Sequence, residues 1–180
     1  SAKYEYILSS VQHGINLPSH LQSEPHDLSQ VNYNHTSGNH RMTDIQAAIG
    51  IEQLKRLSEI VDRRRMLANK YISSLADIDG LKLPNEPSYA RSNFQSFLVR
   101  LESPHKVKKV SEALKEKRID TRPGIMCAHL EPAYWQAWPK GCLPQSEAAM
   151  ENSLTLPLYP TMENYEIDRV INSLIGAIKN

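Results

Sequence analysis

The sequence predicts an α+β fold in which long helices precede a small antiparallel or mixed sheet that carries helices on one face. Three patterns in the 180 residues lead to this prediction. Apolar residues recur at helical spacing between positions 54 and 75, and a second stripe of this kind runs from 167 to 178. Between the two stripes, short apolar runs with strand-like alternation are separated by segments rich in proline and glycine.

The N-terminal third should combine a weak helix, a long loop and a strongly apolar helix. Residues 3–12 give a faint helical pattern, whereas His, Asn, Ser, Pro and Gln dominate 13–41, which is typical of a loop. Thr43 is placed to cap a helix whose first turn contains Asp44. This helix should be buried on several sides, and a bend is expected near Leu57. The apolar residues that surround its axis are Ile45, Ala47, Ala48, Ile49 and Ile51.

Farther along the chain, strands and helices are expected to alternate. A strand with alternating apolar residues spans 97–101, a helix follows at 106–117, and a short strand at 119–122. Residues 123–144 are rich in proline, glycine and aromatic side chains, which predicts an ordered loop. The remaining expected elements are a short helix at 147–152, a strand at 154–156 and a final helix capped by Thr161.

Composition argues against several classes of partner. The formal net charge is +1, so no global field attracts nucleic acid or an anionic membrane, and neither is expected as a partner. No window approaches the run of about 18 apolar residues that spans a bilayer. Cys127 and Cys142 lack a CxxC spacing, which favours two separate reduced thiols in a cytoplasmic protein.

The sequence lacks the residue patterns of familiar catalytic and metal sites. Its seven histidines include no pair at i, i+4 helical spacing and carboxylates do not cluster with them, so no metal site is predicted. It has neither a GxSxG turn nor a glycine-rich phosphate loop. Consecutive helical residues point about 100° apart, so the triplet at 63–65 cannot form one patch. Arg63 and Arg65 are expected on the charged face of the helix, and Arg64 near its apolar stripe. The residues alone therefore predict a globular domain with one long polar loop and no catalytic residue.

A series of motifs in a fixed order resembles the DegT-type family of nucleotide-sugar aminotransferases. The most specific is NHRMTDIQAA at 39–48, and the pair at 13–14 matches the end of the family's R-x-H-G. The other matching runs are RRRMLANKY (63–71), GIMCAHLEPAY (124–134), LPQSE (143–147) and SLTLPLYP (153–160). The resemblance covers nearly the whole chain and is to the C-terminal part of such an enzyme.

The resemblance implies an aspartate-aminotransferase-like fold of type I that works as a cytoplasmic homodimer. Residues 1–57 would be the end of the large cofactor-binding domain with its interface loop, and 58–180 the C-terminal small domain. The cofactor would be pyridoxal 5'-phosphate. The reaction would be amino transfer, with glutamate as the donor, to a keto group of a nucleotide-linked sugar in polysaccharide biosynthesis.

The resemblance also assigns three site residues. Asn39 would donate a hydrogen bond from its amide to the cofactor phosphate of the other subunit. Arg41 would pair with a carboxylate or phosphate of the substrate, with a structural salt bridge as the alternative. His129 would lie near the mouth of the active site and contact the substrate.

Two departures from the family pattern concern the loop and the mechanism. Around the asparagine, the usual glycine and aromatic residues are replaced by Ser37, Gly38 and His40, which predicts a more flexible loop or a differently shaped sugar pocket. Family members also hold the cofactor on a lysine in an S-x-x-K context, and no such motif precedes His13. The chain, which begins at Ser1, is therefore expected to be a piece of a longer protein and inactive alone. Two alternatives remain open: a sugar 3-dehydratase of the same family, or a non-catalytic dimerisation or interaction domain.

Overall fold

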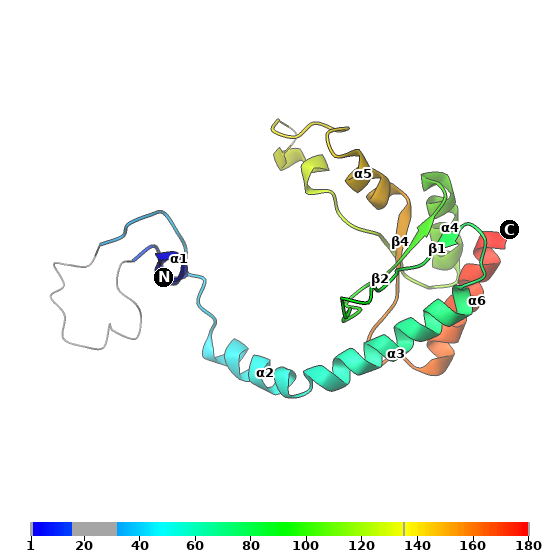
Figure 1. Cartoon of the computed structure of the whole chain (residues 1–180), viewed down its shortest axis with the longest axis horizontal. Coiled ribbons are helices and arrows are strands. Elements are labelled where there is room, and N and C mark those ends of the chain that lie inside the picture. The colour runs from blue at the N-terminus through cyan, green and yellow to red at the C-terminus, as the bar shows by residue number, and fades with distance from the viewer. Residues whose placement is uncertain (1, 16–31, 135, 180) are drawn as a thin grey trace. The chain divides into compact units, whose positions relative to one another are not determined.

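The computed structural model describes residues 2–15, 32–134 and 136–179 (Figure 1). The chain divides into two compact units, Ser1–Lys55 and Arg56–Asn180. Whether 1–57 is the end of a cofactor domain stays a prediction, because compactness alone does not say what else packs on each unit.

The first unit contains the two helices expected there. Helix α1 (Ala2–Ser10) is followed by turns up to residue 15; the part of the predicted loop at 16–31 lies outside the described residues. Helix α2 (Asp44–Lys55) begins directly after the predicted cap. There Gln46 N donates to Thr43 Oγ1 over 3.3 Å, and Thr43 N donates to Gln46 Oε1 over 2.9 Å. This reciprocal pair is a capping box, which satisfies two backbone donors at the start of the helix.

Helix α2 differs from its prediction in burial. The apolar residues that surround its axis were expected to be covered on several sides, yet none of its residues is buried. Ile45 is the extreme case, with 75% of its surface exposed. Burial on several sides therefore requires a partner surface that the described residues of this chain do not provide.

The second unit begins where the predicted bend lies. Arg56 interrupts the helical run after α2, and its backbone oxygen accepts a hydrogen bond from Ile60 N over 3.0 Å in the next helix. The elements of this unit are α3 (Leu57–Leu75), β1 (Leu81–Lys82), β2 (Phe97–Leu101), α4 (Pro104–Glu116), β3 (Arg122–Pro123), the 3-10 turns η3 (Ala128–Leu130) and η4 (Pro132–Tyr134), α5 (Pro144–Glu151), β4 (Ser153–Leu156) and α6 (Asn164–Lys179).

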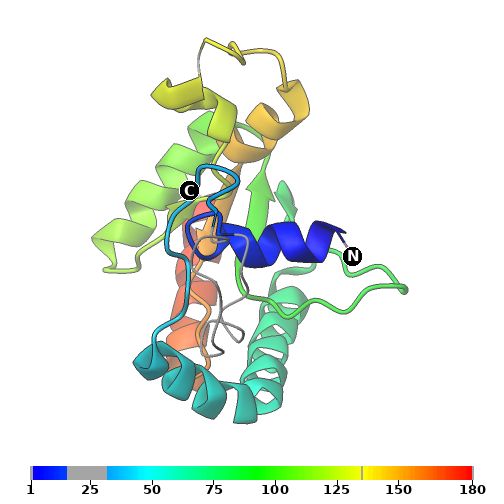
Figure 2. The same ribbon diagram turned by 90° about the vertical axis from the view of Figure 1, so that its left-hand side faces the viewer.

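The strands form one antiparallel sheet in the order β1-β2-β4-β3, which confirms the predicted sheet type. In β2 the burial pattern alternates, and Val99 pairs with Leu154 of β4 so that both face the core. Helices α3, α4 and α6 supply the apolar side chains that pack against this face. Figures 1 and 2 show α4 and α6 running side by side against the sheet. The expected α+β architecture is therefore confirmed for this unit.

The centre of the core is an aromatic stack. The rings of Tyr71 on α3 and Phe97 on β2 lie 4.8 Å apart at their centroids, and both side chains are fully buried. The Tyr71 hydroxyl donates to the Pro157 oxygen over 2.8 Å. Burial raises the pKa of Tyr71 above its ordinary value, so the phenol stays a neutral donor.

Three boundaries differ from the sequence prediction. The strand expected at 119–122 is β3, displaced to 122–123, because Ile119 instead packs into the core directly after α4. Helix α5 begins three residues earlier than expected, with Pro144 in its first turn, where the missing N–H costs nothing. Thr161 does not cap the last helix, which begins at Asn164.

The arginine triplet of α3 binds loops, which corrects the expectation of a charged solvent face for Arg63 and Arg65. Arg64 Nη1 donates to three backbone oxygens, of Phe94, Gln95 and Leu158, over 3.0–3.2 Å. Its neighbour Arg63 donates through Nη2 to the Met162 oxygen over 2.6 Å. These bonds tie the 92–96 and 157–162 loops to the helix, because a guanidinium can serve several acceptors at once.

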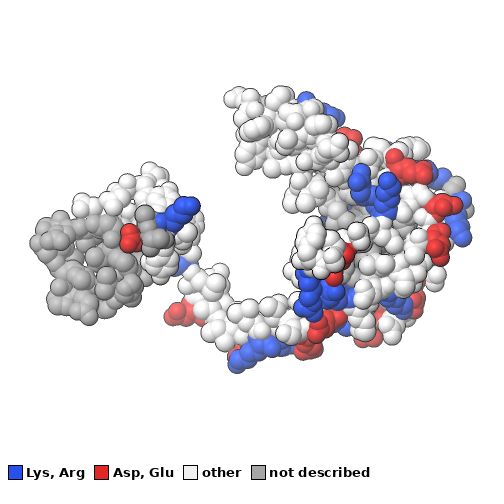
Figure 3. Space-filling view, viewed as in Figure 1, with Lys and Arg blue, Asp and Glu red and all other residues white. Residues whose placement is uncertain are grey.

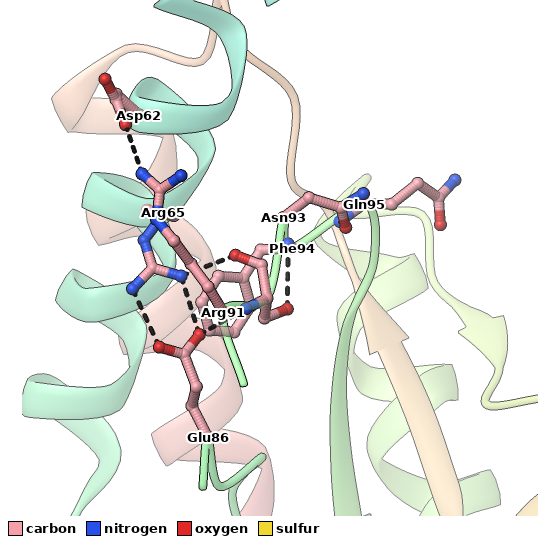
Figure 4. Close-up of polar contacts among 8 residues, drawn as sticks. Asp62, Arg65, Glu86, Arg91, Asn93, Phe94 and Gln95 are labelled. Atoms are coloured by element: carbon pink, nitrogen blue, oxygen red, sulfur yellow. Dashed lines mark hydrogen bonds and ion pairs between the residues drawn. The ribbon is translucent and has the colours of Figure 1, made fainter. Parts of the chain in front are cut away.

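The third arginine of the triplet forms a bidentate ion pair, drawn in Figure 4. Arg65 Nη1 lies 2.7 Å from Glu86 Oε2, and Arg65 Nη2 lies 3.0 Å from Glu86 Oε1. Ser92 N also donates to Glu86 Oε2 over 2.7 Å. The Arg65 hydrogen bond, followed by that of Ser92, lowers the pKa of Glu86 to about 2. This carboxylate therefore anchors the 84–92 loop in its ionised form.

A pH-dependent loss of stability follows from this ion pair. The folded-state pKa of Glu86, about 2, lies below its ordinary value of 4.5. Its stabilising contribution is therefore complete above pH 4.5 and is lost as the pH falls towards 2. We expect Glu86→Gln to lower the melting temperature at neutral pH and the difference from wild type to shrink through this window. Melting temperatures measured from pH 7 downward check this, with the exposed Glu116→Gln as the control. The prediction would be contradicted if the difference between Glu86→Gln and wild type varied with pH no more than the difference for Glu116→Gln.

No helix in the described ranges is both long enough and apolar enough to cross a membrane.

Candidate functional site

The structure brings together two of the three site residues that the sequence suggested. In the loop before α2, the Asn39 side-chain oxygen accepts hydrogen bonds from the Arg41 backbone N over 3.2 Å and from Arg41 Nε over 3.4 Å. Both residues are exposed. Because the carboxamide oxygen is occupied by Arg41, the amide nitrogen is the end of Asn39 that remains to donate to a ligand.

Backbone contacts with the segment after α1 hold this loop. His13 N donates to the Gly38 oxygen over 2.9 Å, and His40 N donates to the Val11 oxygen over 2.9 Å. Between these bonds, Gln12 and Asn39 form an antiparallel bridge. The replacements that predicted a more flexible loop thus lie in a segment with bonds on both sides of Asn39.

A glycine allows this close approach. Gly14 has φ +77°, and a Cβ at this position would lie 2.0 Å from the His35 oxygen. Any other residue would therefore clash with the His35 backbone as well as being strained. Gly14 N donates to the Ser9 oxygen over 2.8 Å, which closes the turn after α1. The physical role of the His-Gly motif is thus to place the asparagine loop.

The donors in this loop fit an anionic group such as a phosphate. The Asn39 amide is a neutral donor, and the exposed Arg41 guanidinium beside it adds a positive charge. Across the described ranges, no carboxylate forms an ion pair with Arg41, so the alternative of a structural salt bridge finds no partner there.

The third predicted residue, His129, lies in the second unit, beside a pocket of about 800 Å³. Turn η3 carries His129, and further lining comes from the loop before η3, from three residues between η4 and α5, and from α5 itself. Most of the described lining is apolar or aromatic, including Ile125, Met126, Tyr134, Trp138 and Leu143. In the view of Figure 3, the surface around the position of α5 is mostly uncharged. The pocket therefore suits a ligand with a substantial apolar face.

A buried acid, Glu147, lies against His129, and no pattern in the sequence singles it out. Glu147 Oε1 lies 2.9 Å from His129 Nε2 and accepts a hydrogen bond from Gly141 N over 2.7 Å. These partners, His129 first, lower the pKa of Glu147 below its usual range. The two side chains are only 6% and 9% exposed. Glu147 falls in the LPQSE motif, but a motif match does not say which residue the acid contacts.

Comparison with known proteins identifies the class. The model of the DegT/DnrJ/EryC1/StrS aminotransferase family matches residues 11–175. The chain belongs to this family.

Solved structures support the same conclusion and show the extent of the match. The aminotransferase TlmJ from Streptoalloteichus hindustanus is 25% identical, with 95% of this chain and 43% of that chain covered and a TM-score of 0.76. DesV from S. venezuelae, in complex with a ketimine intermediate, is 29% identical over 83% of this chain and 40% of its own, with a TM-score of 0.74. NtdA from Bacillus subtilis, with bound cofactor PMP, is 25% identical over 96% and 39%, with a TM-score of 0.77.

The chain therefore spans less than half the length of these solved structures. Its fold is that of the C-terminal part of aspartate-aminotransferase-like enzymes, as the resemblance implied.

Proposed function

We propose that this chain is the C-terminal region of a pyridoxal-phosphate-dependent transaminase that aminates a keto group of a nucleotide-linked sugar, with glutamate as the amino donor. The observation that carries the proposal is the family match over 11–175, joined to solved relatives that include a PMP-bound protein. In this proposal, residues 1–57 form the end of the large cofactor domain with its interface loop. Residues 58–180 form the C-terminal small domain, and the whole enzyme is a cytoplasmic homodimer.

The residues of this chain take three roles in the proposed reaction. Asn39 donates from its amide nitrogen to the cofactor phosphate of the other subunit, while Arg41 holds the amide oxygen. Arg41 also offers its guanidinium to a carboxylate or phosphate of the substrate. His129 contacts the substrate from the wall of the second-unit pocket. Pyridoxal phosphate, when bound, supplies the electron sink and carries the amino group between donor and acceptor.

The 180 residues alone are proposed to be inactive, because no S-x-x-K motif precedes His13 to hold the cofactor covalently. The test is to mix the purified chain with pyridoxal phosphate, reduce with borohydride and locate any adduct by mass spectrometry. We expect no stoichiometric adduct at a single lysine in this chain. A protein extended upstream of Ser1 should give one adduct and transfer amino groups from glutamate. An adduct with turnover in the 180-residue chain would overturn the proposal.

Replacing Asn39 is expected to weaken cofactor binding by the extended protein. Asn39→Ala removes one hydrogen bond to a charged acceptor, a loss of about 2 kcal/mol or roughly thirtyfold in Kd for pyridoxal phosphate. Asn39→Asp should be worse, because a carboxylate repels the phosphate. Spectroscopic titration of the apoenzyme measures both, with the exposed Asn85→Ala as the matched control. An unchanged Kd in both Asn39 variants would remove this residue from the cofactor site.

A further inference from the structure

The carboxylate of Glu147 is buried beside His129, in surroundings where an unpaired charge would raise the free energy of the folded state. Both side chains are more than nine-tenths buried, and the pocket that His129 lines is mostly apolar. A carboxylate in such surroundings persists only when it is paired and hydrogen-bonded. Glu147 meets this requirement through Oε1, which His129 Nε2 and Gly141 N share, and through a weaker contribution from the Leu143 backbone N–H.

That oxygen joins three segments that form the pocket walls. His129 comes from turn η3, Gly141 from the loop before α5, and Glu147 from α5 itself. Gly141 has φ +92°, a left-handed conformation that glycine adopts without strain, and its N–H is directed at the carboxylate. Removing the carboxylate would therefore release both the histidine ring and the loop.

The same contact fixes the chemistry of the imidazole. An ionised carboxylate can only accept hydrogen bonds, so the Nε2 atom that lies 2.9 Å from Glu147 must carry the hydrogen. In the neutral ring, Nδ1 is then the acceptor. Without this partner the ring could exchange the two tautomers or turn over, and its hydrogen-bonding character would no longer be defined.

We propose that Glu147 is a positioning residue: it holds the His129 ring with the hydrogen on Nε2 and ties down the 139–143 loop, so that the pocket presents Nδ1 as an acceptor to an N–H or O–H group of the substrate. The substrate contact of His129 rests on the proposed transaminase function, whereas the tautomer and the loop contact do not. The pocket's lining indicates that the recognised part of the substrate has an apolar or ring-shaped face.

Nuclear magnetic resonance on the 180-residue chain tests the first part. Long-range nitrogen–proton spectra should show the neutral ring in one tautomer, with the hydrogen on Nε2. In Glu147→Gln, whose amide can also donate, the Nδ1–H tautomer should appear, and exchange at the Gly141 amide should accelerate. The exposed Glu131→Gln should change neither readout. Wild-type spectra with the hydrogen on Nδ1, or identical tautomers in wild type and Glu147→Gln, would overturn the proposal.

Kinetics of the extended protein test the second part. We expect Glu147→Gln to raise KM for the nucleotide-linked sugar about tenfold, as for one lost hydrogen bond, and to alter its pH profile, with cofactor affinity unchanged. An active wild type with unchanged KM and pH profile in the variant would overturn the positioning role. If the wild type transfers no amino group at all, the proposed function fails, while the tautomer result still decides the role of Glu147 in the fold.

Discussion

Replacing Phe97 by alanine is expected to lower the free energy of unfolding of the 56–180 unit by about 3–5 kcal/mol. Phe97 lies in the second strand of the sheet, has no exposed surface and stacks on Tyr71. A second aromatic ring, that of Phe94, lies 6.3 Å from its centroid. Truncation therefore removes apolar contacts on two sides and leaves a cavity that the strand cannot fill without moving. Urea unfolding followed by circular dichroism measures the loss.

Two further variants make the Phe97 result interpretable. Phe97→Leu keeps most of the volume and should cost clearly less than alanine, because the cavity is smaller. Tyr89→Ala removes an aromatic ring that is 90% exposed, and its effect should stay within about 0.5 kcal/mol. A loss below about 1 kcal/mol for Phe97→Ala would mean that this ring is not at the centre of the core.

Replacing Arg64 by methionine should produce the next largest loss, about 3 kcal/mol. Methionine keeps much of the apolar stem but leaves three backbone oxygens without their shared donor, those of Phe94, Gln95 and Leu158. The Phe94 backbone also has a positive φ of 44°, a strained conformation that surrounding bonds must maintain. Losing the guanidinium should therefore loosen the 92–96 loop as well as lower stability. Urea unfolding and amide exchange at 94–96 report the two effects.

The comparison with other substitutions separates the geometry of Arg64 from its charge. Arg64→Lys keeps the charge but not the planar fork, so it should recover only part of the loss. Arg91→Met breaks the exposed pair with Asp62, which is drawn in Figure 4, and should cost at most about 1 kcal/mol. Equal losses for Arg64→Met and Arg91→Met would show that the three carbonyl contacts contribute little.

The parts of the fold that could be predicted from the sequence are those set by local periodicity. Alternation in 97–101 predicted β2, and the 3.6-residue spacing in α3 and α6 predicted helices whose apolar stripes do pack on the sheet. The break at Arg56 was also anticipated within a residue or two. Periodicity predicted the wrong element or boundary where the structure depends on contacts with distant parts of the chain. Ile119 looked like part of a strand but packs in the core, and Thr161 looked like a cap although the helix starts later.

For the candidate site, the sequence supplied identities but not partners. Asn39 and Arg41 came from the motif resemblance, and nothing in their spacing said that the guanidinium would hold the amide oxygen. Glu147 stands 18 positions after His129, and only the tertiary fold brings the two together. The capping box at α2 is the exception, because Gln46 stands three residues after Thr43 and the motif is local, although only Thr43 is predicted above. Contacts between residues far apart in sequence depend on how the elements pack, which local patterns do not encode.

Because the apolar residues of α2 are exposed, substitutions at its isoleucines should have different effects on folding and on activity. A screen that scores only the folding of these 180 residues should tolerate polar residues at Ile45 and Ile49, because neither side chain is buried here. A screen that scores the activity of the extended protein should reject the same changes, if the cofactor domain covers this helix. Positions that are permissive in the first screen and restricted in the second would then trace the footprint of that domain on the chain, residue by residue.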